Sequence, residues 1–249
     1  MFAEQPPFQK PPDTNAPIWR YLDFSKFVDL LETQTLFFNR TDRFDDEFEG
    51  SYPQLNTLLR PMLYGGETKI SAHLLAKMSV TFKEWRRFMA INCWHMSNHE
   101  SAAMWKLYLK GNEGISICST YNRLVESFLP CDDTIYVGVV KYIDYDTEWM
   151  PEGSLFYPFV HKRKSFQHEN ELRAIICRFP IEKDGKADLS QDTIDQGINV
   201  PIAFTKLVSK VCVAPTSPGW FRRLVEVVLK KYNLEAEVVN SSLAKRPVY

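Results

Sequence analysis

The stretch HKRKSFQHENELRAIICRF, residues 161–179, joins a polar half to an apolar half. The apolar half begins near Glu171 and is built around two adjacent isoleucines, which predicts a strand. Alternate residues of a strand share one face, so Glu169, Glu171 and Arg173 would project together if the strand begins early enough. The segment therefore predicts a sheet strand with charged side chains at its entrance.

Strand patterns occur on both sides of this segment. The one densest in β-branched residues is TIYVGVVKYI, residues 134–143. The others are IWRYL (18–22), TLFF (35–38), INCWH (91–95), GISICS (114–119), INVPIAF (198–204), LVSKVCVAP (207–215) and EAEVV (235–239). Several strands follow one another directly while others alternate with helices, so we predict the α+β class: a single domain with a central mixed β-sheet flanked by helices.

Helices are predicted from apolar spacing and from capping residues. Asp23 or Ser25 can cap a helix that buries one apolar face, and Ser97 with Glu100 fits a capping box. The apolar face of the first helix is Phe27, Leu30 and Leu31. Residues 54–90 are predicted to be mostly helical, with breaks at Pro61 and Gly65-Gly66 and an apolar face of Leu74, Leu75, Met78, Phe82 and Trp85. Further helices are predicted through Met104, Trp105 and Tyr108, after Thr120, and from Pro218 onward.

Composition sets the class of protein. Residues 1–17 hold five prolines and predict an extended arm, so the domain itself would span residues 18–249. An aromatic content of 14% predicts a real core.

The net charge of -1 argues against a surface that attracts nucleic acid or membrane as a whole, but allows a local basic patch. No apolar run approaches the roughly 18 residues of a membrane span, and the start is unlike a secretory signal, so no membrane partner and a cytoplasmic location are expected.

Three polar segments are candidates for a functional surface. The first is Trp19-Arg20-Tyr21 together with the charge run of residues 39–49. Such a run is usually a solvated loop. Phe44 and Phe48 interrupt it, however, and could pin it to the core so that some of its charges face inward and are paired. In that arrangement the carboxylates and arginines could bind a cation or a polar ligand.

The second segment, CWHMSNHESAAMWKLYLKG, contains His95, His99 and Glu100. These are metal-capable side chains, but their spacing matches no zinc signature, so a structural or capping role is favoured and no metal is predicted. The five cysteines form no CxxC pair, which indicates reduced thiols rather than a zinc ribbon or a redox motif. Trp105 and Tyr108 lie three apart on one helical face, which is more typical of core than of a stacking platform.

The third segment is the polar half of residues 161–173. Its basic cluster, Lys162, Arg163 and Lys164, would attract phosphate or carboxylate groups. The competing interpretation is an edge strand protected from aggregation by its charges. Both interpretations stay open at this point.

Taken in combination, several motifs resemble a bacterial family known as a domain of unknown function (family 2971). They are Trp-Arg-Tyr before a helix and a strand, RFDDEFEG (43–50), CWHM (93–96), MWKLY (104–108), HENELRA (168–174) and SSLAKRPVY (241–249). The resemblance runs from about Ile18 to Tyr249 and implies no activity.

The opening order of a strand, a helix and a second strand is also similar to that of ADP-ribosyltransferases. This resemblance implies an arginine or histidine on the first strand that holds NAD, here Arg20, and a late glutamate that stabilises the cationic sugar carbon, here Glu171 or Glu169. The central serine of that family has only Ser97 as a candidate. The expected site therefore has Glu171 and Glu169 as catalytic residues, with NAD held by Arg20, Tyr21, His95, Ser97 and Lys164. Families of this kind often act in stress or phage defence.

Two hypotheses of other classes remain. In the first, residues 161–173 form a non-catalytic module that docks a nucleic acid or an acidic partner, and its binding would weaken steeply with salt. In the second, Asp45, Asp46 and Glu49 converge with the histidines in a metal-dependent nuclease. No glycine-rich phosphate loop is present, so a Rossmann-type dinucleotide site is not expected.

Overall fold

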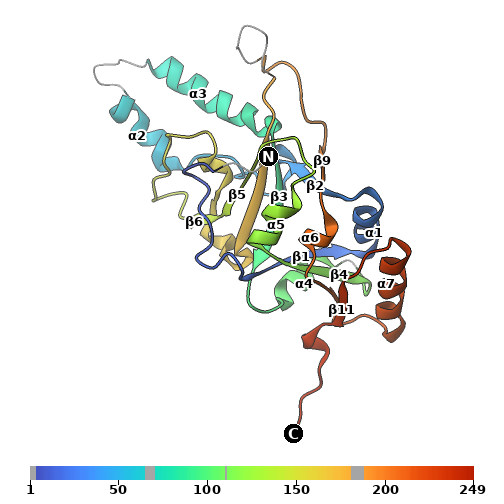
Figure 1. The fold of residues 1–249 in the computed structure, drawn as a ribbon. Coiled ribbons are helices and arrows are strands. Elements are labelled where there is room, and N and C mark those ends of the chain that lie inside the picture. The colour runs from blue at the N-terminus through green and yellow to red at the C-terminus, as the bar shows by residue number, and fades with distance from the viewer. Residues whose placement is uncertain (1–3, 65–70, 110, 181–187) are drawn as a thin grey trace.

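A central sheet organises the computed structural model, which describes residues 4–64, 71–109, 111–180 and 188–249 (Figure 1). Within these ranges nine strands join one sheet, and seven of them lie in the order β11-β10-β4-β1-β3-β2-β9. The nine strands are β1 (Pro17–Asp23), β2 (Thr35–Arg40), β3 (Met89–Met96), β4 (Gly114–Thr120), β5 (Ile135–Val139), β8 (Glu171–Cys177), β9 (Gly197–Pro201), β10 (Lys210–Val213) and β11 (Glu237–Asn240). Only the β10–β11 pair among them is parallel, so the sheet is mixed and the predicted α+β single domain is confirmed.

Strand β3 is the point where the sheet forks. One edge of β3 pairs with β8 from Met89 to His95. On its other edge, β2 is registered with β3 only at Ala90 and Ile91, and β1 only at His95 and Met96. Between these two short ladders, β1 and β2 diverge and leave a split in the sheet. Strand β8 continues the fork, because it pairs with β5 on its far side and is therefore an interior strand, so the edge-strand interpretation is wrong.

Both faces of the sheet are buried. The larger core lies under α1 (Phe24–Thr33), α5 (Tyr121–Ser127), α6 (Phe204–Leu207) and α7 (Gly219–Lys231). Smaller clusters on other strand positions pack around Phe159 and around Trp105, the latter on α4 (Ala102–Tyr108). Each large side chain that is fully buried stabilises the fold by about 1.5–3 kcal/mol, so this core anchors the strands on both sides of the split.

Local sequence signals account for several helix starts. Asp23 caps α1 by accepting a hydrogen bond from the Lys26 amide at 2.9 Å, and Phe27, Leu30 and Leu31 of that helix are buried as predicted. Thr120 caps α5 in the same way, through the Arg123 amide at 3.2 Å. Each cap satisfies an amide that the first helical turn leaves free.

The predicted capping box is wrong. Helix α4 begins at Ala102, and Ser101 caps it through the Met104 amide at 3.3 Å. Glu100 instead accepts hydrogen bonds from Trp105 and from Ser241 and Ser242 near the C-terminus. The five residues after β3 are therefore a connection, and Glu100 ties it to the end of the chain.

Two predicted breaks also differ from the structure. Helix α2 (Gln54–Tyr64) continues through Pro61, while Gly65-Gly66 lies outside the described residues. The strand expected at residues 134–143 divides at Val140, because β5 joins the main sheet while β6 (Lys141–Ile143) pairs with β7 (His161–Arg163) in a separate small sheet. In α3 (Ala72–Trp85), the side chains of Leu74, Leu75 and Met78 also lie outside the described set.

Short 3-10 turns complete the chain: η1 (Thr41–Arg43), η2 (Arg86–Phe88), η3 (Tyr157–Phe159), η4 (Lys164–Glu169) and η5 (Ser242–Ala244). The described part of the proline-rich arm is packed against the domain. Phe8 is buried and stacks on Tyr136 with ring centres 5.2 Å apart, and the Val139 amide donates to the Gln9 carbonyl at 2.9 Å. None of the described helices combines the length and apolar character that a bilayer crossing requires.

Candidate active site

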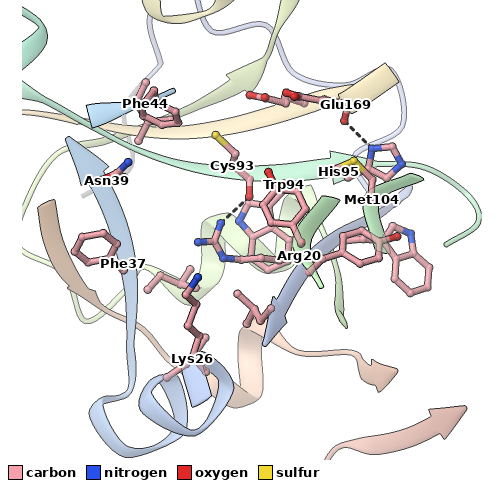
Figure 2. A pocket seen from close by; sticks show the side chains of 18 of the residues that line it. Arg20, Lys26, Phe37, Asn39, Phe44, Cys93, Trp94, His95, Met104 and Glu169 are labelled. Carbon is pink, nitrogen blue, oxygen red and sulfur yellow. Dashed lines mark hydrogen bonds between the residues drawn. The ribbon is translucent and has the colours of Figure 1, made fainter. Parts of the chain in front are cut away.

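A cavity of about 370 Å³ lies at the split between β1 and β2. Consecutive strand residues point to opposite faces of a sheet, yet Arg20, Tyr21 and Leu22 of β1 all line this cavity. The cavity therefore reaches side chains of both faces at the place where the strands separate. In Figure 2, Arg20 and Lys26 lie toward one side of the cavity, and Glu169 lies toward the other.

The guanidinium of Arg20 has no carboxylate partner within the described part of the chain. Its Nη1 donates to the Cys93 carbonyl at 2.7 Å, in the section of β3 that neither β1 nor β2 pairs. Burial lowers the pKa of Arg20, although a guanidinium keeps its charge in proteins. A partly buried cation that lacks a counter-ion is costly, so the cavity is suited to an anion at this point.

Two carboxyl groups, Glu169 and Glu171, line the same cavity. Glu171 enters β8, where its Oε1 accepts from Lys162 at 2.9 Å and its Oε2 accepts from Arg173 at 2.6 Å. Glu169 ends η4, and its Oε2 accepts from Lys162 at 2.5 Å. The expected convergence of Arg20 with the late glutamates is thus present in one cavity.

The two glutamates differ in their protonation. Burial would raise the pKa of Glu171, but the positive charges of Arg173 and Lys162 outweigh it and hold the pKa below its usual range. Burial, together with the hydrogen bond and negative charge of Glu171, raises the pKa of Glu169 to about 7. The pair therefore offers a fixed anion beside a carboxyl group that can exchange a proton at neutral pH.

The charge run of residues 39–49 contributes to this arrangement. Glu49 is 2% exposed and pairs with Arg173, so its charge faces inward as the pinned alternative requires. Phe44 packs on the core and lines the cavity, whereas Phe48 stays 45% exposed and lies under the Arg163 guanidinium at 4.1 Å. One phenylalanine therefore anchors the loop in the core, and the other shields an ion pair.

Tyr21 and His95 line the wall near α4. The His95 Nδ1 donates to the Glu169 carbonyl at 2.6 Å, and burial lowers the pKa of His95, which keeps the ring neutral at pH 7. The Tyr21 hydroxyl accepts from the Ser101 amide at 2.8 Å, and its ring meets Trp105 edge-on. The Glu169 carbonyl therefore holds His95 in place, and Ser101 and Trp105 hold Tyr21.

Two residues expected in the site lie elsewhere. Ser97 does not line the cavity; its hydroxyl accepts from the His99 amide and its carbonyl accepts from Trp19. Lys164 does not line it either and pairs with Glu148 on the exposed surface. Ser97 follows the end of β3, and Lys164 begins η4 at the opposite end from Glu169 with an exposed side chain.

Sequence reasoning did not nominate the lining residues Lys26 and Phe37, and it included Asn39 and Cys93 only as members of longer polar segments, without a role in the site. Phe37 and Asn39 alternate along β2 with the fully buried Phe38. Alternation of a polar residue with core residues is the signal that could have marked them, but it does not show that the opposite face lines a cavity.

The other two hypotheses are not favoured by the geometry. Among the described residues, no group of three or more histidine, cysteine, aspartate or glutamate side chains is arranged to hold a metal ion. The cations of the basic cluster are each paired, Lys162 with three glutamates, Arg163 with Asp46, and Lys164 with Glu148. A docking surface for nucleic acid would present such charges unpaired.

No protein-family model and no curated protein matches the chain, so membership of family 2971 stays a prediction. Solved structures similar in fold include three of Thermus sp. 2.9 DarT. The complex with NAD+ has a TM-score of 0.44 at 8% identity and covers 96% of this chain and 100% of that one. The complexes with carba-NAD+ and with ADP-ribosylated ssDNA have TM-scores of 0.41 and 0.42, at 8% and 9% identity, and each covers 94% of this chain and 97% of that one. Similarity at this level carries no functional assignment, which must come from the cavity.

Proposed function

We propose that this protein is an ADP-ribosyltransferase-like enzyme that uses NAD as its substrate. The observation that carries the proposal is one cavity that holds both the Arg20 guanidinium, which has no carboxylate partner among the described residues, and a pair of carboxyl groups, Glu169 and Glu171. Breaking the nicotinamide–ribose bond places positive charge on the sugar, which a carboxylate stabilises. The phosphates of NAD are negatively charged, so the reaction also needs a cation to hold them.

The anionic part of NAD fits the Arg20 side of the cavity. The planar guanidinium can donate to two phosphate oxygens at once. Lys26 points from α1 toward Arg20 (Figure 2), and its nearest acid, Asp23, is 3.5 Å away. A cavity of about 370 Å³ lies within the range of small-molecule sites, roughly 300–1,000 Å³.

A planar ring of the substrate fits the β2 wall. Phe37 is 45% exposed and lies over Gly197 of β9, where an added Cβ would come within 2.4 Å of its ring. The Asn39 side chain makes no hydrogen bond within the described part of the chain and lines the same wall. A stacking surface beside a free amide suits the face and the edge of a nicotinamide or a base.

The carboxyl pair supplies the chemistry. The bond between nicotinamide and the sugar breaks, and its electron pair leaves with the neutral nicotinamide. The acceptor gives an electron pair to the sugar carbon and passes its proton to the Glu169 carboxylate. The Glu171 carboxylate, fixed by Lys162 and Arg173, provides negative charge beside the cationic sugar.

The test is calorimetry with NAD up to millimolar concentration and an assay of nicotinamide release with nucleic acids and proteins as acceptors. We expect saturable binding that Arg20→Met weakens by about tenfold or more, and turnover that Glu169→Gln removes while binding is retained. Lys164→Gln, on the exposed surface, is the matched control and should change neither. Absence of both binding and nicotinamide release overturns the proposal. A role in stress or phage defence, which the resemblance implies, and a cytoplasmic location both stay predictions.

A further inference from the structure

Five charged side chains form one buried cluster beside the cavity. They come from four separate segments: Glu49 after η1, Lys162 on β7, Glu169 on η4, and Glu171 and Arg173 on β8. Their side chains are between 0% and 15% exposed, and Glu169 is the most exposed of them. Three carboxyl groups thus share two cations in a poorly solvated space.

Arg173 is fully engaged at the centre of this cluster. Its Nη1 and Nη2 donate to the two oxygens of Glu49 at 2.8 and 2.7 Å, and Nη1 also donates to the Phe159 carbonyl at 2.9 Å. Its Nε donates to Glu171 at 2.6 Å. The bidentate pairing fixes the plane of the guanidinium, and that plane in turn fixes the direction of the Glu171 carboxylate.

Lys162 is shared by all three acids. Its Nζ lies 2.5 Å from Glu169, 2.9 Å from Glu171 and 3.3 Å from Glu49. If every group is ionised, the cluster carries one excess negative charge, which is unfavourable when buried. Glu49 and Glu171 each contact both cations, whereas Lys162 is the one cation of the cluster that Glu169 contacts, and Glu169 faces the cavity. A proton that neutralises the excess charge therefore binds to Glu169.

We propose that Glu49 is a positioning residue of the site. It binds Arg173 with both carboxylate oxygens, and it is the third carboxylate in a cluster that has two cations. Because of this imbalance in charge, Glu169 is the group that binds and releases a proton at the cavity. The catalytic consequence rests on the proposed function. The proton binding itself does not, because it follows from the charge count and the contacts alone.

The surroundings of Glu169 support this assignment. The titratable side chains around it are Lys162 of β7, Glu171 of β8, His95 of β3 and Tyr108 of α4, and His168 precedes it in the chain. Burial lowers the pKa of His95 and raises the pKa of Tyr108 to about 12, so both are neutral at pH 7. Lys162 and Glu171 are the charged groups in contact with Glu169, and their balance depends on Glu49.

The experiment is NMR titration of the glutamate side-chain carboxyl carbons in the full-length chain. We expect one glutamate to titrate between about pH 6 and 8, and its signal to be absent in Glu169→Gln. Glu49→Gln removes the excess negative charge, so the same transition should move to lower pH by about one unit or more, a tenfold loss of proton affinity. Glu49→Asp keeps the charge and should leave the transition at or near its original pH.

A second variant covers the case in which Glu49→Gln does not fold. Lys162→Gln removes a cation and should move the transition of Glu169 to higher pH, the opposite direction. The inference is overturned if no glutamate of the wild type titrates in this range, or if the transition is unchanged in whichever variant folds. A protein that shows the titration but does not bind NAD would refute the proposed function and leave this inference standing.

Discussion

At the scale of single residues, Arg20 is the side chain whose environment is least explained by folding alone. It is a partly buried cation that donates only to a backbone carbonyl within the described part of the chain, whereas Arg40, Arg173 and Arg178 each meet a carboxylate. The resemblance to ADP-ribosyltransferases nominated Arg20, because it implies an arginine or histidine on the first strand. The sequence could not show that the guanidinium lacks a partner, since partners of a strand residue come from other strands.

Replacement of this residue should separate stability from binding. We expect Arg20→Met to change the free energy of unfolding by no more than about 1 kcal/mol, because a lost hydrogen bond is offset by removal of a desolvated charge. Chemical denaturation measures this value. The exposed Arg222→Met, which loses only a surface pair with Glu226, is the comparison. A loss of several kcal/mol for Arg20→Met would show that the guanidinium is structural.

At the scale of secondary-structure elements, the sequence predicted which segments form strands more successfully than it predicted the residues at which those strands begin and end. Dense β-branched runs identify strands locally, but the break at Val140 arises because β5 and β6 pair with different partners. The capping box failed for a related reason: β3 extends to Met96 and Glu100 is engaged by Ser241 and Ser242. Contacts between residues far apart in the sequence decide where such elements end, and a local sequence pattern does not reveal those contacts.

The loop that delivers Glu49 depends on the next residue. Gly50 has φ of 72°, and an added Cβ would lie 2.6 Å from the Phe159 ring and 3.0 Å from Arg86. We expect Gly50→Ala to lower the free energy of unfolding by about 1–3 kcal/mol and to shift the NMR titration of Glu169, since Glu49 is displaced. Gly153→Ala is the control, because an added Cβ there meets nothing within 4 Å. Equal stability of the two variants would contradict this account.

At the scale of the whole molecule, the site draws on segments that are far apart in the chain. Arg20 and the two glutamates were nominated by the resemblance to ADP-ribosyltransferases, and the structure places them in one cavity. Glu49 and Lys162 were expected only as a pinned loop and a basic cluster. Their meeting with Arg173 depends on how β7, β8 and the charged loop pack, which composition and spacing do not encode.

The buried cluster should also shape how the stability of the whole protein depends on pH. Glu171 has a pKa below its ordinary value of 4.5, so its contribution is lost as pH falls below that value. Glu169 has a pKa raised from 4.5 to about 7, so the folded state binds its proton more tightly and stability falls as pH rises between these values. Denaturation midpoints of wild type and Glu169→Gln, compared across this range, measure the effect. A wild type whose stability rises toward pH 7 relative to the variant would contradict it.

The fork at β3 has a mechanical consequence. On that edge of β3, the portion of the sheet containing β1, β4, β10 and β11 and the portion containing β2 and β9 are each attached by only two registered residue pairs. A solute bound between Arg20 and the β2 wall would bridge these portions and act as a tie across the open seam. Binding would then reduce the motion of strands that do not contact the solute, including the strands at the outermost edges of the sheet.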